Sequence, residues 1–475
     1  MASGPSFRIE GVHGPLYLSE DIRRIERAAG DDKALMERAG AAAADMAATI
    51  AGDKAKDVLI LAGPGNNGGD ARVVAERLKE RFFRVTVATR PAEIPDKPWG
   101  IVVDGLFGIG LGREIAGEHA ALVDYANRVR CPVLALDIPS GLHSDSGRVL
   151  GHAVRATHTI TFIALKPGLL TLDGPDHCGQ IEVADLGLRV SELLAPTAWV
   201  AEPRLFQGAL KPRPRNFHKG MAGSVGILGG AAGMAGAALL AGRAALKLGA
   251  GRIYAGLLSE EVALDFQFPE LMLRHPDDVL GQDLDALVVG PGLGDGERAE
   301  TLVGAALASE LPCVVDADAL NLISENEDLR HACARRSAET LLTPHPAEAA
   351  RLLALPTAEV QADRVKAARA LAANLNAHVV LKGAGSILVA RDGHWFINTS
   401  GNPGMASAGT GDVLAGMLGA LLAQRYSGES ALVLGVHLHG SAGDELVKAG
   451  IGPVGLTASE LIDAARRLWN RWLVS

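Results

Sequence analysis

The sequence predicts an α/β protein of two domains, each built on a mainly parallel sheet covered by helices. Its 475 residues exceed the usual size of a single hydrophobic core. In both halves short Val/Ile/Leu runs alternate with helical patterns, which is typical of βαβ units. Between the halves Lys211–Gly220 has two prolines, clustered positive charge and no apolar period. We therefore expect domains at residues 1–208 and 209–475.

The first half is predicted to form a doubly wound, three-layer domain. Apolar residues at helical spacing predict helices near the N-terminus, packed on the sheet. The first strand, at 57–63, is followed by further strand and helix patterns in alternation. The expected helices are 18–29, 34–51, 71–82 and 121–130, and the remaining strands are 84–89, 101–108 and 132–141.

The second half is predicted to be a larger α/β domain. It repeats the alternation of strand, glycine turn and helix, but it shares no fixed period with the first half, so we expect no internal repeat. A helix from about residue 235 and several C-terminal helices accompany strand patterns within 224–230, 252–258, 284–294, 313–323 and 378–398.

Composition excludes several classes of protein. A net charge of −9, from 46 basic and 55 acidic residues, argues against a nucleic-acid or anionic membrane surface. The four cysteines form no C-x-x-C pair, so neither a zinc site nor a disulfide framework is indicated. The start lacks the apolar segment of a signal peptide, and the uncharged Gly220–Gly242 is too rich in glycine to span a membrane. We therefore expect a cytoplasmic location and no membrane partner.

A glycine and asparagine turn at Leu61–Leu78 separates a buried strand from a helix. It fits neither G-x-G-x-x-G nor a P-loop, which disfavours a dehydrogenase or a P-loop NTPase. Its backbone N–H groups can still bind phosphate, and the amide oxygens of Asn66 and Asn67 can ligate a cation. The alternative is a tight turn stabilised by the asparagine side chains.

Two aspartates, Asp104 and Asp137, follow strands of the same half. Because ligands of open parallel sheets bind outside the carboxyl ends of the strands, we expect both carboxylates to converge there. One can bind a cation together with Asn67 and Ser140, and the other can move protons. Alternatively, each aspartate only forms an Asx turn at its strand end.

The most informative segment is Gly401–Gly416, GNPGMASAGTGDVLAG, in which a glycine-rich turn runs into an apolar helix. Such a helix start presents unpaired N–H groups and a positive dipole end to phosphate oxygens. A carboxylate beside bound phosphate is unfavourable without a cation or a proton-transfer role, so Asp412 is predicted to be catalytic. The alternative is that Asp412 only caps the helix.

Other candidate contacts lie in the second half. Small residues at positions 229, 230, 233, 236 and 237 let backbone approach a flat ring, or else allow close helix–strand packing. His345 lies between two prolines in a stiff loop, which favours a ligand contact over a core histidine. Lys382 and Ser386 flank a glycine turn suited to adenosine phosphates, with a surface hairpin turn as the alternative.

These motifs resemble a known pair of enzyme families. LMERAG, GPGNNGGD, VDGLFGIGLGRE and LDIPSG occur in the order seen in NAD(P)H-hydrate epimerases. The second half, with SVGILGG, LVVGPGLG, VVDADALN and LLTPHPAE, resembles the NAD(P)H-hydrate dehydratase fused to them in bacterial repair enzymes. The resemblance covers nearly the whole chain. It implies a Rossmann-like first domain and a ribokinase-like second domain.

For the first domain the resemblance implies a potassium ion held by Asn67, Asp104 and Ser140, with Asp137 as the acid/base at the nicotinamide ring. Ala71 departs from the glycine expected after GGD, and its methyl group is predicted to crowd the ligand slightly. The dinucleotide is expected to lie against Asn66, Asn67, Gly68, Gly69, Asp70, Gly108, Ile109, Gly110, Leu111, Gly112, Arg113 and Glu114.

For the second domain the resemblance implies an adenine nucleotide, ADP or ATP, with Mg²⁺. Ser407-Ala408 replaces the more usual Thr-Gly, which puts the rate in question rather than the reaction class. The hydrated nucleotide is expected to contact Ala237, Gly294, His345 and Asp412, and the adenine nucleotide to contact Lys382, Gly383, Ala384, Gly385, Ser386 and Gly411.

The implied function is repair of hydrated NADH and NADPH. The first domain interconverts the S and R hydrates, and the second restores the S form through a phosphorylated hydroxyl that leaves as phosphate. Two alternatives remain: a ribokinase-like kinase that releases a phosphorylated alcohol, and a binding module without turnover. We expect small-molecule nucleotides as partners and a homo-oligomeric assembly.

Overall fold

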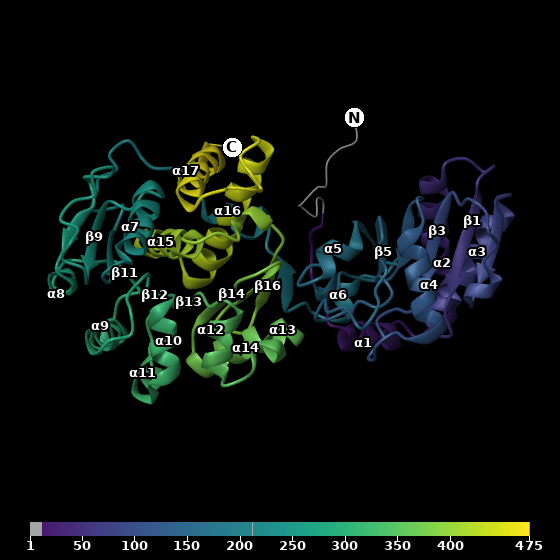
Figure 1. The fold of residues 1–475 in the computed structure, drawn as a ribbon, viewed down its shortest axis with the longest axis horizontal. Coiled ribbons are helices and arrows are strands. Elements are labelled where there is room, and N and C mark those ends of the chain that lie inside the picture. The colour runs from purple at the N-terminus through teal and green to yellow at the C-terminus, as the bar shows by residue number, and fades with distance from the viewer. Residues whose placement is uncertain (1–11, 211, 475) are drawn as a thin grey trace. The chain divides into compact units, whose positions relative to one another are not determined.

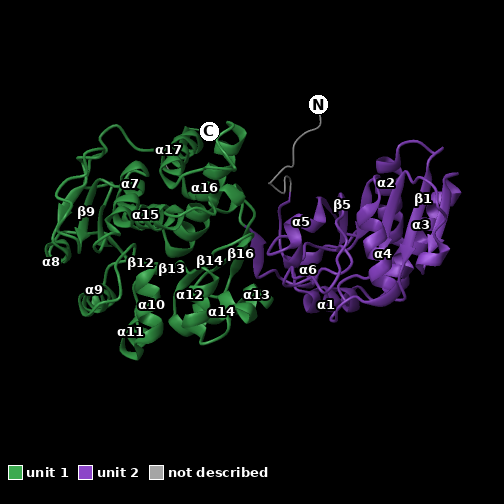
Figure 2. Ribbon diagram, viewed as in Figure 1, with its two compact units in different colours: residues 1–8, 201–475 green, residues 9–200 purple. Residues whose placement is uncertain are grey.

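A computed structural model describes residues 12–210 and 212–474. The chain forms two compact units, divided between Val200 and Ala201 (Figure 2). Both are α/β with parallel sheets, as the sequence predicts. The sequence predicts that the second functional domain begins at residue 209, and this boundary stays a prediction.

In chain order, the first unit ends at Val200 and is purple in Figure 2, where it is labelled unit 2, and the second unit begins at Ala201 and is green, labelled unit 1. The first unit contains a six-stranded parallel sheet in the order β2-β1-β3-β4-β5-β6 (Figure 1). Strands β5 and β6 extend the sheet beyond the elements predicted from the sequence. The elements are α1 (Ser19–Ala29), α2 (Asp32–Ala51), β1 (Asp57–Ala62), α3 (Asn66–Glu80), β2 (Arg84–Ala88), β3 (Ile101–Gly105), α4 (Gly117–Arg128), β4 (Val133–Leu136), β5 (His158–Phe162), α5 (Gly174–Cys178), β6 (Gln180–Ala184), α6 (Val190–Leu193) and β7 (Ala198–Val200).

Alternation along the strands builds a core on each face of this sheet. Ile60 of β1 packs with residues of α2 and α3, whereas its neighbour Leu59 packs with residues of α4. Successive side chains of a strand point to opposite faces, so a strand covered on both sides must be apolar throughout. The predicted three-layer architecture of this unit is therefore confirmed.

The second unit contains a longer sheet with the order β10-β9-β8-β11-β12-β13-β14-β15-β16. It is parallel up to β14 and antiparallel at β15 and β16. Its strands are β8 (Ser224–Gly229), β9 (Arg252–Leu257), β10 (Met272–Arg274), β11 (Ala286–Val289), β12 (Cys313–Val315), β13 (Thr340–Leu342), β14 (His378–Leu381), β15 (Ser386–Val389) and β16 (Trp395–Asn398).

Helices cover this second sheet, and the loops next to them shape a candidate site. The apolar helix α15 packs closely with α7, where Gly416 lies against the backbone of Ala241. The helices are α7 (Ala235–Lys247), α8 (Pro276–Leu280), α9 (Glu297–Ala308), α10 (Asp318–Glu325), α11 (Glu327–Ala334), α12 (Pro346–Leu353), α13 (Thr357–Ala362), α14 (Arg364–Leu375), α15 (Thr410–Ala423), α16 (Gly428–Lys448) and α17 (Ala458–Val474).

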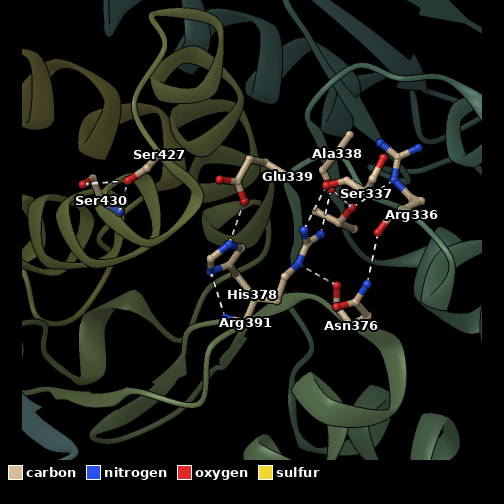
Figure 3. A network of polar contacts seen from close by, with 10 residues as sticks. Arg336, Ser337, Ala338, Glu339, Asn376, His378, Arg391, Ser427 and Ser430 are labelled. Carbon is tan, nitrogen blue, oxygen red and sulfur yellow. Dashed lines mark hydrogen bonds and ion pairs between the residues drawn. The ribbon is translucent and has the colours of Figure 1, made fainter.

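A polar network joins the edge of β13 and β14 to the start of α16 (Figure 3). His378 Nε2 lies 2.8 Å from Glu339 Oε2, and the Gly428 N–H donates to the same carboxylate. Arg391 donates to the carbonyls of Ser337, Ala338 and Asn376 over 2.8–3.0 Å. Each of these carbonyls thus receives a charged donor, which makes the bonds stronger than neutral ones.

We expect Gly428→Ala to destabilise the second unit by about 1–3 kcal/mol, the usual cost of overpacking. A Cβ atom at this position overlaps both the His378 ring and the Glu339 carboxylate. Thermal unfolding of the full chain measures the change. Gly296→Ala is the control, because Gly296 also lies at a helix start, as the N-cap of α9, but a Cβ atom there meets no atom within 4 Å. Equal midpoints for the two variants would contradict the prediction.

Candidate active sites

The glycine and asparagine motif of the first unit forms the beginning of α3. Gly65 is the N-cap, so Asn66 and Asn67 lie in the first helical turn rather than in a loop ahead of the helix. A Cβ atom on Gly68 overlaps the carbonyl of Gly63, so only glycine fits this crossing of helix and strand end. The methyl group of Ala71 is wholly buried in the core beside Gly105, and its predicted effect on a ligand stays a prediction.

Asp104 and Ser140 meet at the carboxyl ends of β3 and β4, as predicted. Asp104 Oδ1 accepts from Ser140 Oγ at 2.6 Å, and Oδ2 accepts from the Ser140 N–H at 2.8 Å. Asp104 is completely buried, and burial raises the pKa of its carboxyl group to about 6. A carboxylate at this depth is costly without a nearby positive charge.

The side chain of Asn67 adds a further oxygen ligand of the type that hard cations prefer. Both polar atoms of its buried side chain lack a hydrogen-bond partner, which is costly at a buried site. A Cβ atom on Gly105 lies 3.0 Å from the Asn67 carbonyl, and one on Gly108 lies 3.4 Å from Asn67 Cγ. The strand end that carries Asp104 therefore lies against Asn67. This set of oxygen ligands is of the kind that an alkali or alkaline-earth cation prefers.

Asp137 occupies the neighbouring strand end with a left-handed backbone conformation, φ 66°. The Ile109 N–H donates to its Oδ2 at 3.4 Å, and a Cβ atom on Gly108 lies 3.2 Å from the same oxygen. The structure thus brings together Asn67, Asp137 and the start of the predicted loop. The remainder of that loop, residues 110–114, is mostly exposed.

Lys166 is a residue of this site that the sequence interpretation missed. Its side chain is fully buried, and Nζ donates to Asp137 Oδ1 at 2.5 Å, to the Phe162 carbonyl at 2.6 Å and to Thr161 Oγ1 at 2.9 Å. The ammonium group fixes the direction of the Asp137 carboxylate and balances its charge. A lysine directly after the apolar run 162–165 was the available signal.

Two further carboxyl groups, those of Asp70 and Glu26, lie close enough to Asp137 for its charge to affect them. Burial first, and then the charges of Asp137 and Glu26, raise the pKa of Asp70 to about 8. Burial and the charge of Asp137 also raise the pKa of Glu26. Near neutral pH, Asp70 is therefore largely protonated and able to donate. A carboxyl group that keeps its proton near neutral pH can serve as an acid beside a base in the same site.

In the second unit the predicted glycine turn is the N-terminal end of α15. Gly409 is its N-cap with φ 88°, and Gly411 and Asp412 lie in the first turn. A Cβ atom on Gly411 lies 3.3 Å from Lys382 Nζ, so this lysine faces the exposed N–H groups of the helix. An anion placed here meets both the helix dipole and an ammonium group.

Asp412 shares this site with other charged side chains. Burial, followed by the charge of Asp316, raises the pKa of Asp412 to about 7, although Lys382 lowers it in part. Asp316 Oδ1 lies 3.2 Å from Lys382 Nζ and accepts from Thr343 Oγ1 at 2.6 Å. Burial opposes the charged form of Lys382, but Asp316 and Glu348 outweigh it and raise the pKa of Lys382.

The segment that follows Lys382 is the turn of an antiparallel hairpin between β14 and β15. Ser386 Oγ donates to the Gly383 carbonyl at 3.0 Å, and the buried Arg364 supports the turn through the carbonyls of Leu381 and Lys382. The hairpin alternative therefore describes the geometry of residues 383–386. Their contact with an adenine nucleotide stays a prediction.

His345 has a structural role that the sequence did not predict. As N-cap of α12 its Nδ1 accepts from the N–H groups of Ala347 at 3.1 Å and Glu348 at 3.3 Å. Its Nε2 lies 3.2 Å from Glu348 Oε1. Burial and the charge of Lys382 lower the pKa of His345, which favours the neutral ring. The predicted contact with a ligand stays a prediction.

The other candidates lie along the rim of the same site. The Gly294 N–H donates to Asp318 Oδ2 at 2.8 Å, and a Cβ atom on the nearby Gly292 lies 3.1 Å from Ala237 Cβ. Asp316 and Asp318 were missed, although acids directly after the strand run 313–315 were the signal. Ala408 is exposed, so its methyl group lies outside the packed part of the turn.

Two family models match the chain. The model described as "NAD(P)H-hydrate dehydratase" matches residues 225–467, and the model described as "YjeF-related protein N-terminus" matches residues 32–99 and 88–168. Among the described residues, no helix is both long and apolar enough to cross a membrane.

Relatives cover both units. The bifunctional NAD(P)H-hydrate repair enzyme of Escherichia coli is 37% identical over 96% of this chain and 94% of its own length. That of Coxiella burnetii is 36% identical over 96% of this chain and 99% of its own length. The ADP/ATP-dependent NAD(P)H-hydrate dehydratase of Bacillus subtilis, a crystal structure, has a TM-score of 0.50 and 30% identity over 57% of this chain and 98% of its own.

Proposed function

Because the chain belongs to the family of bifunctional NAD(P)H-hydrate repair enzymes, we propose that its first unit epimerises hydrated NAD(P)H and its second unit dehydrates the S hydrate with ADP or ATP. The observation that carries this proposal is a carboxyl group under the charge of a nearby lysine in each unit. Asp137 is bonded to Lys166, and Asp412 lies beside Lys382 at a helix start.

In the first unit Asp137 would exchange a proton with the hydrated ring. Lys166 holds Oδ1, which leaves Oδ2 directed at the Gly108–Ile109 backbone, where the resemblance places the dinucleotide. Asn67, Asp104 and Ser140 would hold a potassium ion, whose charge neutralises the buried Asp104 and favours phosphate nearby.

In the second unit Asp412 would accept the proton of the ring hydroxyl while the hydroxyl oxygen attacks the terminal phosphate of the nucleotide. The bond between the transferred phosphorus and the rest of the nucleotide breaks, so AMP or ADP leaves and the hydroxyl becomes a phosphate ester. The C–O bond then breaks to release phosphate, and loss of a proton from the adjacent ring carbon restores the dihydronicotinamide. Lys382 and the N–H groups of α15 stabilise the charge of the transferring phosphoryl group. Mg²⁺ would arrive with the nucleotide and share this charge; the Bacillus subtilis relative was co-crystallised with ATP and Mg²⁺.

The direct test follows dihydronicotinamide absorbance from a mixture of S and R hydrates with ADP and the full chain. Complete recovery, faster than spontaneous epimerisation, is expected. Recovery that stops at the S fraction would show an inactive first unit. A stable phosphorylated product would favour the kinase alternative instead. A homo-oligomer and a cytoplasmic location stay predictions.

Dehydration is expected to rise with pH through an inflection near 7. The pKa of Asp412 is about 7, and below it the carboxyl group holds the proton that it must accept. Asp316→Asn removes a charge that raises this pKa, so the inflection should move to lower pH. The measurement is kcat/KM for the S hydrate at subsaturating ADP, with the exposed Asp392→Asn as control. An inflection unmoved by Asp316→Asn would refute this assignment.

A further inference from the structure

A pocket of about 360 Å³ opens in the second unit beside the predicted substrate residue Gly294. Asp318, which bonds Gly294, lies on its wall and is close enough to Asp412 to raise the pKa of that carboxyl group. One end of the pocket therefore adjoins the reacting ring of the proposed substrate. The rest of the pocket extends along α10, away from Asp412.

One face of α10 forms the length of this pocket. Its lining residues Asp318, Asn321, Leu322 and Glu325 are spaced by three and four positions, which places them on the same side of the helix. At 1.5 Å per residue this stripe extends about 10 Å, from the end near Asp412 to Glu325 at the far end. Glu325 is exposed, so its carboxylate is available to a ligand in the pocket.

The charge of the pocket is mainly negative. Its lining contains three carboxyl groups, those of Asp295, Asp318 and Glu325, and one guanidinium group, that of Arg351. Arg351 Nη1 donates to Asn321 Oδ1 at 2.7 Å, which holds the guanidinium in the middle of the stripe, away from its far end. Met234 is 42% exposed and supplies an apolar surface for a flat ring.

This arrangement suits a nucleoside with free ribose hydroxyls. A carboxylate accepts hydrogen bonds from a ribose diol, and an acid used in this way favours NAD over NADP in dinucleotide sites. A 2′-phosphate in the same place brings about two negative charges against that carboxylate. We propose that this pocket receives an unphosphorylated ribose arm of the substrate and that Glu325 selects hydrated NADH over hydrated NADPH. This inference rests on the proposed function.

The test compares kcat/KM of the full chain for the S hydrates of NADH and NADPH at saturating ADP. The wild type is expected to prefer the NADH hydrate by about tenfold, and Glu325→Lys to shift the ratio toward the NADPH hydrate by at least about tenfold. Glu327→Lys, the same charge change at an exposed residue outside the pocket lining, is the control and should leave the ratio near its wild-type value.

A wild type that treats both hydrates alike, or a Glu327→Lys shift as large as that of Glu325→Lys, would overturn the selection. Turnover of either hydrate supports the proposed function whatever the ratio. If neither hydrate is turned over, the proposed function fails. The selection is then tested only by the binding of NADH and NADPH, measured by their fluorescence. Equal binding of the two by the wild type then overturns it.

Discussion

Asp412→Asn is expected to lower kcat for dehydration of the S hydrate by about 10²–10⁴-fold, the usual contribution of a general base. The amide occupies the same space at the start of α15 but cannot accept the hydroxyl proton as the oxygen attacks phosphorus. Affinity for ADP should be kept or increased, because the substitution removes negative charge beside the proposed phosphate site. Recovery of dihydronicotinamide absorbance from pure S hydrate measures the loss.

The control for this experiment is Asp392→Asn, which changes an exposed acid of the same unit and should retain activity. Epimerisation by Asp412→Asn, measured as interconversion of S and R hydrates, should equal that of the wild type. A variant that binds ADP, folds normally and still dehydrates at the wild-type rate would remove Asp412 from the mechanism. In that case its raised pKa reflects only burial.

Asp137→Asn should produce the opposite pattern. Epimerisation is expected to fall by about 10²–10⁴-fold, whereas dehydration of pure S hydrate stays unchanged. Asparagine keeps the hydrogen-bonding shape but removes the carboxylate that Lys166 holds at 2.5 Å. With a mixed substrate, fast recovery should stop at the S fraction.

Lys166→Met tests whether the lysine acts through Asp137. Removing the ammonium group leaves the carboxylate next to it buried without its charged partner, which is costly, so epimerisation should fall here too. The double variant Asp137→Asn/Lys166→Met should be no slower than Asp137→Asn alone, because the lysine then has no carboxylate to hold. Additive losses would show that Lys166 has a separate role at the substrate.

Some parts of the structure followed from local sequence patterns alone. The buried strand β1 could be predicted, because both of its faces are covered and it must be apolar throughout. The acids after β3 and β4 could be placed at one edge, because parallel strands end together. The glycines before α15 predicted a helix start open to an anion, which is where Gly409 and Asp412 lie.

Other parts depend on contacts between distant residues. Lys166 and Asp137 are 29 positions apart, and Lys382 and Asp316 are 66 apart, so no spacing rule connects them. The two prolines around His345 predict a ligand contact, which stays a prediction, but only the structure shows that His345 caps α12. The signal of residues 383–386 fitted a hairpin turn equally well, because glycine serves both purposes.

The sequence by itself determined the α/β class, the strand-end positions of the acids and the family, since apolar periodicity and glycine turns are local properties of the chain. Only the tertiary structure decided which lysine meets which carboxylate and how far each pKa moves. Burial and the charges around a group arise when strands and loops from distant parts of the chain pack together, and these surroundings make Asp412 titrate near 7 instead of near 4.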